Sequence, residues 1–212
     1  MSSRTSSKFL SGIVLCLATI GSVNAEDTLL SLMQKLKSAP LSRISYQETR
    51  TLKLMTEPWH GSGYLYSLPP DLMIREQLQP QRLLMGVKGN KALYFDPKEN
   101  VRHQGDLDGD NELSVPLTVF KALVNADETL LRSLYDIDFS SESQAWSMNL
   151  TPKQKTGSVS KIVVSGLSGQ QANKISITQE DGDVSKFSLQ KDADGAKNNG
   201  VINKLYQELL GE

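Results

Sequence analysis

The hydrophobic period changes along the chain, and each change predicts a different secondary structure. Apolar residues at 26–40 recur at helical spacing, which predicts one amphipathic helix that ends at Pro40. Apolar and polar residues then alternate, which predicts strands. Glu48 and Arg50 interrupt the apolar phase of the first alternating run, so one face of that strand is expected to be partly polar.

Short strand-like runs follow at close spacing, and each is bounded by residues that favour turns. Pro, Gly, Asn and Asp occupy the breaks between them. This pattern is typical of an antiparallel meander. The runs cover residues 63–68, 72–78, 82–87, 92–95 and 101–104.

The middle of the chain is predicted to be helical. An acidic loop at 106–112 precedes two segments with helical spacing, 116–124 and 128–134. Strand-like alternation resumes at Trp146 and continues to Leu189, and a weak helical pattern follows at 198–210.

This order of elements predicts a single sheet-based domain, since the chain has neither an internal repeat nor a long linker. A long antiparallel sheet must bury one face, and it can curl so that the few helices cover its open side. We therefore expect an α+β, mainly β fold. It would be a strongly curved, unclosed antiparallel β-barrel with helices forming a lid over an apolar cavity.

The first 25 residues have the order of a secretory signal peptide. Arg4 and Lys8 precede a short apolar segment at 9–20, and Ala25 ends an acceptable cleavage site. The apolar segment is shorter than the roughly 20 residues of a membrane span. We expect residues 1–25 to be removed and residues 26–212 to form one domain.

Cys16 raises the alternative of a lipid-anchored chain. Lipidation requires a small residue before the cysteine, and Leu15 stands there, so we favour cleavage after Ala25. The mature chain would then lack cysteine, and with it any disulfide or thiolate chemistry. Removal of two basic residues leaves 21 basic against 24 acidic residues, a net charge of −3. This balance gives no electrostatic case for nucleic acid.

Residues suited to catalysis are few. His60 and His103 are the only histidines, which is too few for a site of histidine and cysteine ligands. The run at 166–169 misses the G-x-S-x-G nucleophile motif and is better interpreted as a turn. The acidic loop at 106–112 departs from the EF-hand register, which favours a solvated loop over a calcium site. We expect no enzyme, no catalytic residue, no metal site and no cofactor.

The apolar residues indicate a binding surface more than a plain core. Five methionines follow residue 25, one on the first predicted helix and four on different strand-like runs. Methionine suits surfaces that accommodate variable apolar partners, and aromatic side chains add contact area. Ordinary core packing is the alternative for any single residue. The predicted cavity residues are Leu54, Tyr66, Met73, Met85, Phe95, Phe120, Leu123, Trp146 and Met148.

Several short motifs in a fixed order resemble the LolA-type periplasmic carriers of outer-membrane lipoproteins, and within them a LolA-related branch. The motifs are Tyr46-Gln47-Glu48, Gly63-Tyr64-Leu65-Tyr66, Pro69-Pro70-Asp71-Leu72-Met73, the hairpin at 88–97, the strand at 146–152 and the hairpin at 175–189. The resemblance implies a curved barrel that binds the acyl chains of a lipoprotein or another lipid. It also implies a periplasmic carrier that shuttles this cargo from an inner-membrane donor to an outer-membrane acceptor. We expect a monomer that binds no nucleic acid.

One residue departs from the carrier pattern. The cavity arginine of the family aligns with Pro69, and Arg75 is the nearby residue that could substitute for it as a polar cavity residue. Met73 keeps an apolar character at an aligned cavity position. The alternative function is a sensor or assembly module of the same fold, which binds a protein partner in response to lipid.

Overall fold

The computed structural model describes residues 28–38, 43–107, 119, 121–123, 125, 127–142, 144–154, 158–191 and 199–212. The predicted signal peptide, Phe120 and most of the acidic loop lie outside these residues. The strands are β1 Arg43–Thr51, β2 Trp59–Leu68, β3 Leu72–Gln79, β4 Leu83–Lys88, β5 Lys91–Asp96, β6 Val101–Asp106, β7 Tyr135–Glu142, β8 Ala145–Pro152, β9 Val159–Leu167, β10 Ala172–Gln179 and β11 Val184–Lys191. The helices are α1 Leu29–Ser38, α3 Glu128–Leu134 and α4 Asn199–Leu210.

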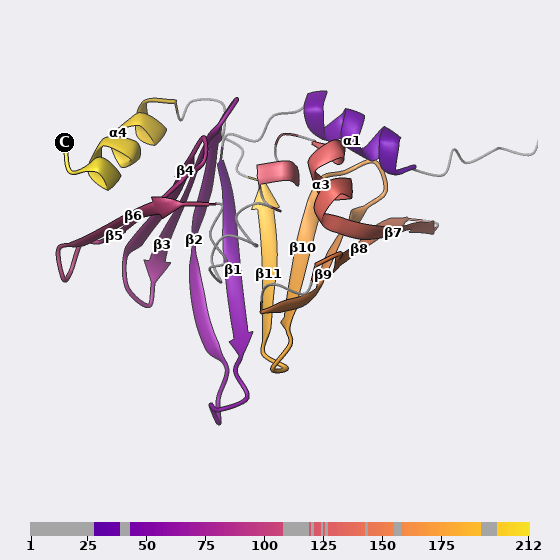
Figure 1. Ribbon diagram of the computed structural model, residues 1–212, viewed down its shortest axis with the longest axis horizontal. Helices are drawn as coiled ribbons and strands as arrows, with labels where there is room; N and C mark the ends of the chain where they lie inside the picture. Colours follow the sequence, from indigo (N-terminus) through magenta and orange to yellow (C-terminus); the bar gives the residue numbers. More distant parts are fainter. Residues whose placement is uncertain are drawn as a thin grey trace, which may run out of the picture.

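All eleven of these strands form one unclosed, curved antiparallel sheet (Figure 1). Their order is β6-β5-β4-β3-β2-β1-β11-β10-β9-β8-β7, so β6 and β7 are the two edges. Neighbouring strands are also consecutive in sequence, except where β1 pairs with β11 at the centre. The predicted fold class is therefore confirmed.

Strand β7 is the element that the sequence interpretation missed. Tyr135, Ile137 and Phe139 alternate with polar residues and are more buried than their neighbours, which is the signal of a half-buried strand. Helix α3 runs directly into this strand, and Asp136 and Asp138 are poor strand formers, so the change of period is easily overlooked.

The two faces of the sheet are covered by different helices. We call the face that carries Tyr46 the inner face. Over β7–β11 it packs against α1 and α3 in a core that includes Leu32, Leu131 and Trp146. Over β2–β5 the opposite, outer face packs against α4, whose Ile202 supplies a fully buried contact. None of the helices that the structure describes is long and apolar enough to cross a membrane.

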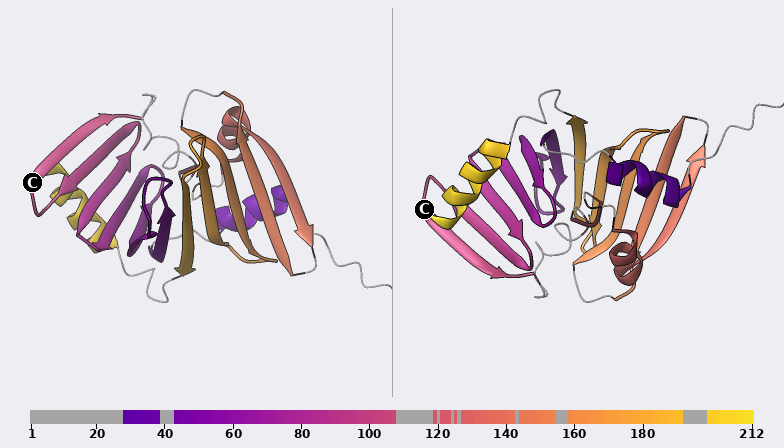
Figure 2. Two further views of the ribbon diagram at one scale, coloured as in Figure 1. Left: turned by 90° about the horizontal axis from the view of Figure 1, so that it is seen from below. Right: turned by 90° about the horizontal axis from the view of Figure 1, so that it is seen from above.

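In the view from above, α4 lies in front of one half of the sheet and α1 lies in front of the other half (Figure 2, right). The twist of the sheet explains why helices on opposite faces appear on the same side. Adjacent strands rotate by roughly 20–25° relative to one another. Six steps separate β4 from β9 in the strand order, so the sheet normal turns by roughly 120–150° between them. The outer face of one half and the inner face of the other half therefore point in similar directions.

Helix α4 is fixed to the outer face by an ion pair as well as by its apolar side chains. Arg82 donates to both carboxylate oxygens of Glu208, at 2.5 and 2.9 Å, and also contacts Glu76 at 3.0 Å. The hydrogen bond from Arg82 holds the pKa of the Glu208 carboxyl below its ordinary value of 4.5. Because the folded pKa is depressed, the ion pair stabilises the fold above the ordinary pKa and loses that effect as the pH falls through the depressed value.

We therefore predict a pH-dependent contribution of α4 to stability. The thermal unfolding midpoint of the wild type should exceed that of Glu208→Gln at pH 7, and the two should converge as the pH falls well below about 4.5. Thermal unfolding followed by circular dichroism measures this difference. A difference between the two proteins that stays constant from pH 7 to pH 3 would show that the charge of Glu208 is not involved.

Candidate functional site

One glycine of β2 allows side chains from β1 and β3 to meet on the inner face. Gly63 pairs with Tyr46 on one side and Gln77 on the other. Strands on either side of a third are about 9.5 Å apart, so their side chains meet only when the middle strand carries no side chain between them. A Cβ atom at Gly63 would lie 2.0 Å from the backbone oxygen of Glu76.

Glu48 lies between two arginines at this crossing. Its side chain is 1% exposed, and it accepts from Nη2 of Arg75 at 2.5 Å and from Nε of Arg50 at 2.6 Å. Arg75 also donates from Nε to the Tyr46 hydroxyl at 2.9 Å and from Nη2 to Gln77 at 3.2 Å. The cluster therefore holds two positive charges and one negative charge in a largely dry part of the sheet.

Burial raises the pKa of the Tyr46 hydroxyl, although the nearby charge of Arg75 opposes the effect. The phenol consequently stays protonated at neutral pH and accepts from Arg75 as a neutral oxygen. The guanidinium of Arg75 lies 4.9 Å from the centroid of the same ring, a geometry in which the ring face attracts the cation.

The polar cluster continues along the inner face toward β5. Gln77 donates to the backbone oxygen of Gln81 at 3.0 Å, and Gln81 donates to both carboxylate oxygens of Asp96 at 2.8 and 3.0 Å. Asp96 also accepts from the backbone amide of Lys98 at 2.9 Å. These fixed contacts support the position of Arg75 from one side.

An apolar row lies beside Arg75 on the same face. The strand register aligns Arg75 of β3 with Met85 of β4 and Tyr94 of β5. Along β4 and β5 the outer-face residues, such as Leu84 and Phe95, are buried under α4, whereas Met85 and Tyr94 remain partly exposed. Leu83 and Ala92 on the inner face are also partly exposed. Taken together, the inner face offers apolar area next to a guanidinium group.

A family model for proteins described as "outer membrane lipoprotein carrier protein LolA-like" matches residues 20–207. The chain belongs to this family. No curated protein matches the chain.

Solved structures with a similar course of the chain come from several bacteria. A LolA superfamily protein, NE2245 from Nitrosomonas europaea, is 10% identical with a TM-score of 0.41, covering 81% of this chain and 97% of that one. An outer membrane lipoprotein-sorting protein domain from Vibrio parahaemolyticus is 11% identical with a TM-score of 0.45, covering 82% and 96%. A chain of the MucA/MucB complex of Pseudomonas aeruginosa is 12% identical with a TM-score of 0.39. The match covers 77% of this chain and 56% of that one. The family assignment rests on the family model alone.

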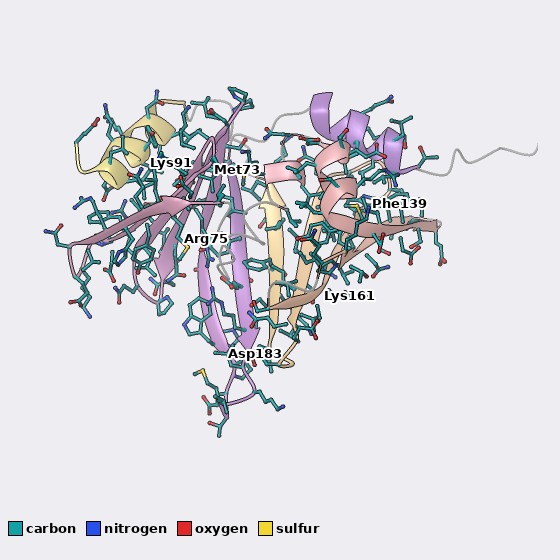
Figure 3. All side chains as sticks on the ribbon, in the orientation of Figure 1. Met73, Arg75, Lys91, Phe139, Lys161 and Asp183 are labelled. Atoms are coloured by element: carbon teal, nitrogen blue, oxygen red, sulfur yellow. The ribbon has the colours of Figure 1, made fainter. Side chains whose placement is uncertain are left out.

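In this LolA-like chain the predicted cavity residues fall into separate groups. Arg75, Met73 and Met85 share the inner face of β3 and β4, and Figure 3 labels the first two of them. Leu123, Trp146 and Met148 belong to the inner-face core of the other half of the sheet, which includes residues of α1 and α3. Phe120 lies outside the described residues.

Three of the predicted cavity residues do not face the inner side. Tyr66 and Phe95 point to the outer face and pack in the core that α4 completes. Leu54 is 98% exposed in the loop between β1 and β2. Alternation shows which residues share a face, but it does not show which face a helix will cover. The alternating pattern also extended the first predicted strand to Leu54, whereas β1 ends at Thr51.

Glu48, Gln77 and Tyr94 are residues that the sequence interpretation did not assign to the site. A signal for Glu48 exists in the sequence, because a carboxylate in the apolar phase of a strand requires a cationic partner when buried. Gln77 and Tyr94 carry no such signal, since their positions follow from the register with β2 and β4.

Proposed function

We propose that this LolA-like protein is a periplasmic carrier that binds acyl chains of a lipoprotein or another lipid on the inner face of β3–β5. The observation that supports it most is the partly exposed row of Met85 and Tyr94 beside Arg75. Each methylene group removed from water contributes ~0.8 kcal/mol. An acyl chain along this row would therefore bind reversibly, as a shuttle between two membranes requires.

Arg75 would hold the polar end of the lipid. Its Nε and Nη2 atoms are occupied by Tyr46, Glu48 and Gln77, whereas Nη1 has no hydrogen-bond partner among the described residues. An ester carbonyl or phosphate oxygen could accept from this free nitrogen. The rest of the guanidinium would stay fixed, so binding would not require the Glu48 ion pair to break.

The remaining predicted residues would take part only if the helices move. Met73 is buried next to the apolar row and would extend it. Leu123, Trp146 and Met148 are covered in the core with α1 and α3. They would contact lipid if those helices separate from the sheet when a second acyl chain enters.

We predict that Met85→Glu weakens binding of a fluorescent fatty-acyl probe at least about tenfold, because the new carboxylate lies where the chain would pack. The side chain is partly exposed, so the variant should fold. Leu78→Glu is the matched control, since Leu78 is 40% exposed on the outer face of the neighbouring strand. Titration of the probe measures both affinities. Equal affinities for the two variants would exclude the inner face of β4 as the binding surface.

Transfer experiments separate a carrier from a sensor. A carrier should move a labelled lipid from donor to acceptor vesicles at a rate that rises with protein concentration, and native mass spectrometry of the purified protein should show bound lipid. A sensor should instead change its affinity for a protein partner when lipid binds, without catalysing transfer.

A further inference from the structure

The loop between β1 and β2 carries its most apolar residue at its apex. A hydrogen bond from the Met55 amide to the Leu52 oxygen at 3.0 Å closes a turn, with Lys53 and Leu54 at the two central positions. Such positions usually carry Gly, Asn, Asp or another polar residue. Here Leu54 is 98% exposed and Met55 is 51% exposed, so two adjacent apolar side chains point into solvent.

This apex is held in place by the neighbouring hairpin. The amide of Lys53 donates to Oδ1 of Asp183 at 2.7 Å, which joins the β1–β2 loop to the β10–β11 turn. Figure 1 shows that this pair of hairpins forms the lower end of the molecule, and Figure 3 places Asp183 there. The loop is therefore a fixed projection, and its apex would be the first part of this end to meet a flat surface.

We propose that this apex inserts into the apolar layer of a lipid bilayer when the protein docks on a membrane. A side chain exposed on nearly all sides is buried only by a partner that surrounds it. Fluid acyl chains do this without a matching shape, whereas a protein partner would need a dedicated pocket. Trp59 lies at the base of the loop with Arg50 4.7 Å from its ring centroid, so an aromatic group and a cation follow the apolar apex. This order of side chains is typical of interfacial membrane segments.

The charges around the apex indicate which membrane it would bind. Lys53 and Glu57 of the loop offset each other, and the adjacent turn adds Asp181 and Asp183. Attraction to anionic lipids is therefore absent, and the apolar residues must supply the affinity. Docking should occur on zwitterionic phosphatidylcholine vesicles and should change little between low and high salt.

Vesicle flotation of the chain without its predicted signal peptide, residues 26–212, tests this inference, since the apolar segment at 9–20 would itself partition into lipid. Leu54→Asn should reduce the fraction of protein that floats with phosphatidylcholine vesicles, with a partition coefficient at least about tenfold lower, since one leucine side chain remains in water. Leu167→Asn is the matched control, because Leu167 is 46% exposed at the far end of its strand, next to the β9–β10 turn. It should float as the wild type does.

A second variant reports insertion directly. Leu54→Trp keeps an apolar apex, and brominated phosphatidylcholine should quench its fluorescence more strongly than that of the wild type, whose Trp59 lies at the base of the loop and whose Trp146 is 1% exposed. Neither substitution at Leu54 changes the inner face. The fluorescent fatty-acyl probe should therefore bind Leu54→Asn and Leu54→Trp as tightly as it binds the wild type. Failure of acyl binding in the wild type would thus leave the membrane inference intact. The inference would be overturned if Leu54→Asn floated as well as the wild type, or if Leu54→Trp were quenched no more than the wild type. Cross-linking of the apex to a protein in place of lipid would also overturn it.

Discussion

Replacing Gly63 with alanine is expected to destabilise the protein more than the same change at any other described glycine of the sheet. The new Cβ would lie 2.0 Å from the Glu76 backbone oxygen and 2.9 Å from the Gln77 Cα. Both contacts are with backbone, so no side-chain rotation can relieve them. Strands β2 and β3 would have to separate, and the Arg75 cluster rests on that pair. We expect a loss of at least about 4 kcal/mol in the free energy of unfolding, or failure to fold.

Two other glycines provide graded controls for this substitution. A Cβ at Gly86 would be too close only to the Cδ1 atom of Leu209, at 2.7 Å, since the backbone oxygen of Met73 would lie at an ordinary 3.6 Å. The Leu209 side chain of α4 can rotate, so we expect a loss of about 1 kcal/mol. A Cβ at Gly105 would meet nothing within 4 Å, so the alanine should be neutral or slightly stabilising. Urea unfolding of the three variants measures the series. A Gly63→Ala protein as stable as Gly105→Ala would show that β2 and β3 are not in the close contact described here.

The order of elements was predictable because hydrophobic periodicity reports local geometry. The helix before β1, the meander of β2–β6 and the terminal helix follow from spacings of 3.6 and 2 residues. The exception is β7, whose alternation starts at the residue directly after a helix. The central pairing of β1 with β11 joins residues more than 130 positions apart, and no local pattern carries that information.

The site was less predictable because it depends on which face each helix covers. The alternation of β4 and β5 does not show whether their inner-face or their outer-face side chains are buried. The outer-face side chains, Leu84 and Phe95, are buried because α4 packs on them. Arg75 could be proposed from sequence as a polar residue of the cavity. Its contact with Glu48 could not, because it depends on Gly63 in the strand between them.

Removing the charge of Arg75 should be strongly destabilising, and removing both charges should restore most of the loss. Arg75→Met leaves the 1% exposed carboxylate of Glu48 with Arg50 alone, and breaking a buried pair costs about 3–5 kcal/mol. Replacing a buried pair by apolar residues of similar volume is often nearly neutral. The double variant Glu48→Leu/Arg75→Met should therefore unfold at a urea concentration close to that of the wild type. Arg50→Met should cost only about 1 kcal/mol, since Arg50 is 38% exposed.

The double variant also separates the structural role of Arg75 from its proposed contact with lipid. If Nη1 of Arg75 holds the polar end of the ligand, the double variant should fold normally and still bind an acyl probe about tenfold more weakly, the loss expected for one hydrogen bond from a charged donor. Titration of the same probe against wild type and double variant makes the comparison at similar stability. Unchanged affinity in a stable double variant would assign the arginine to the sheet alone, and the apolar row of Met85 and Tyr94 would then have to bind lipid without it.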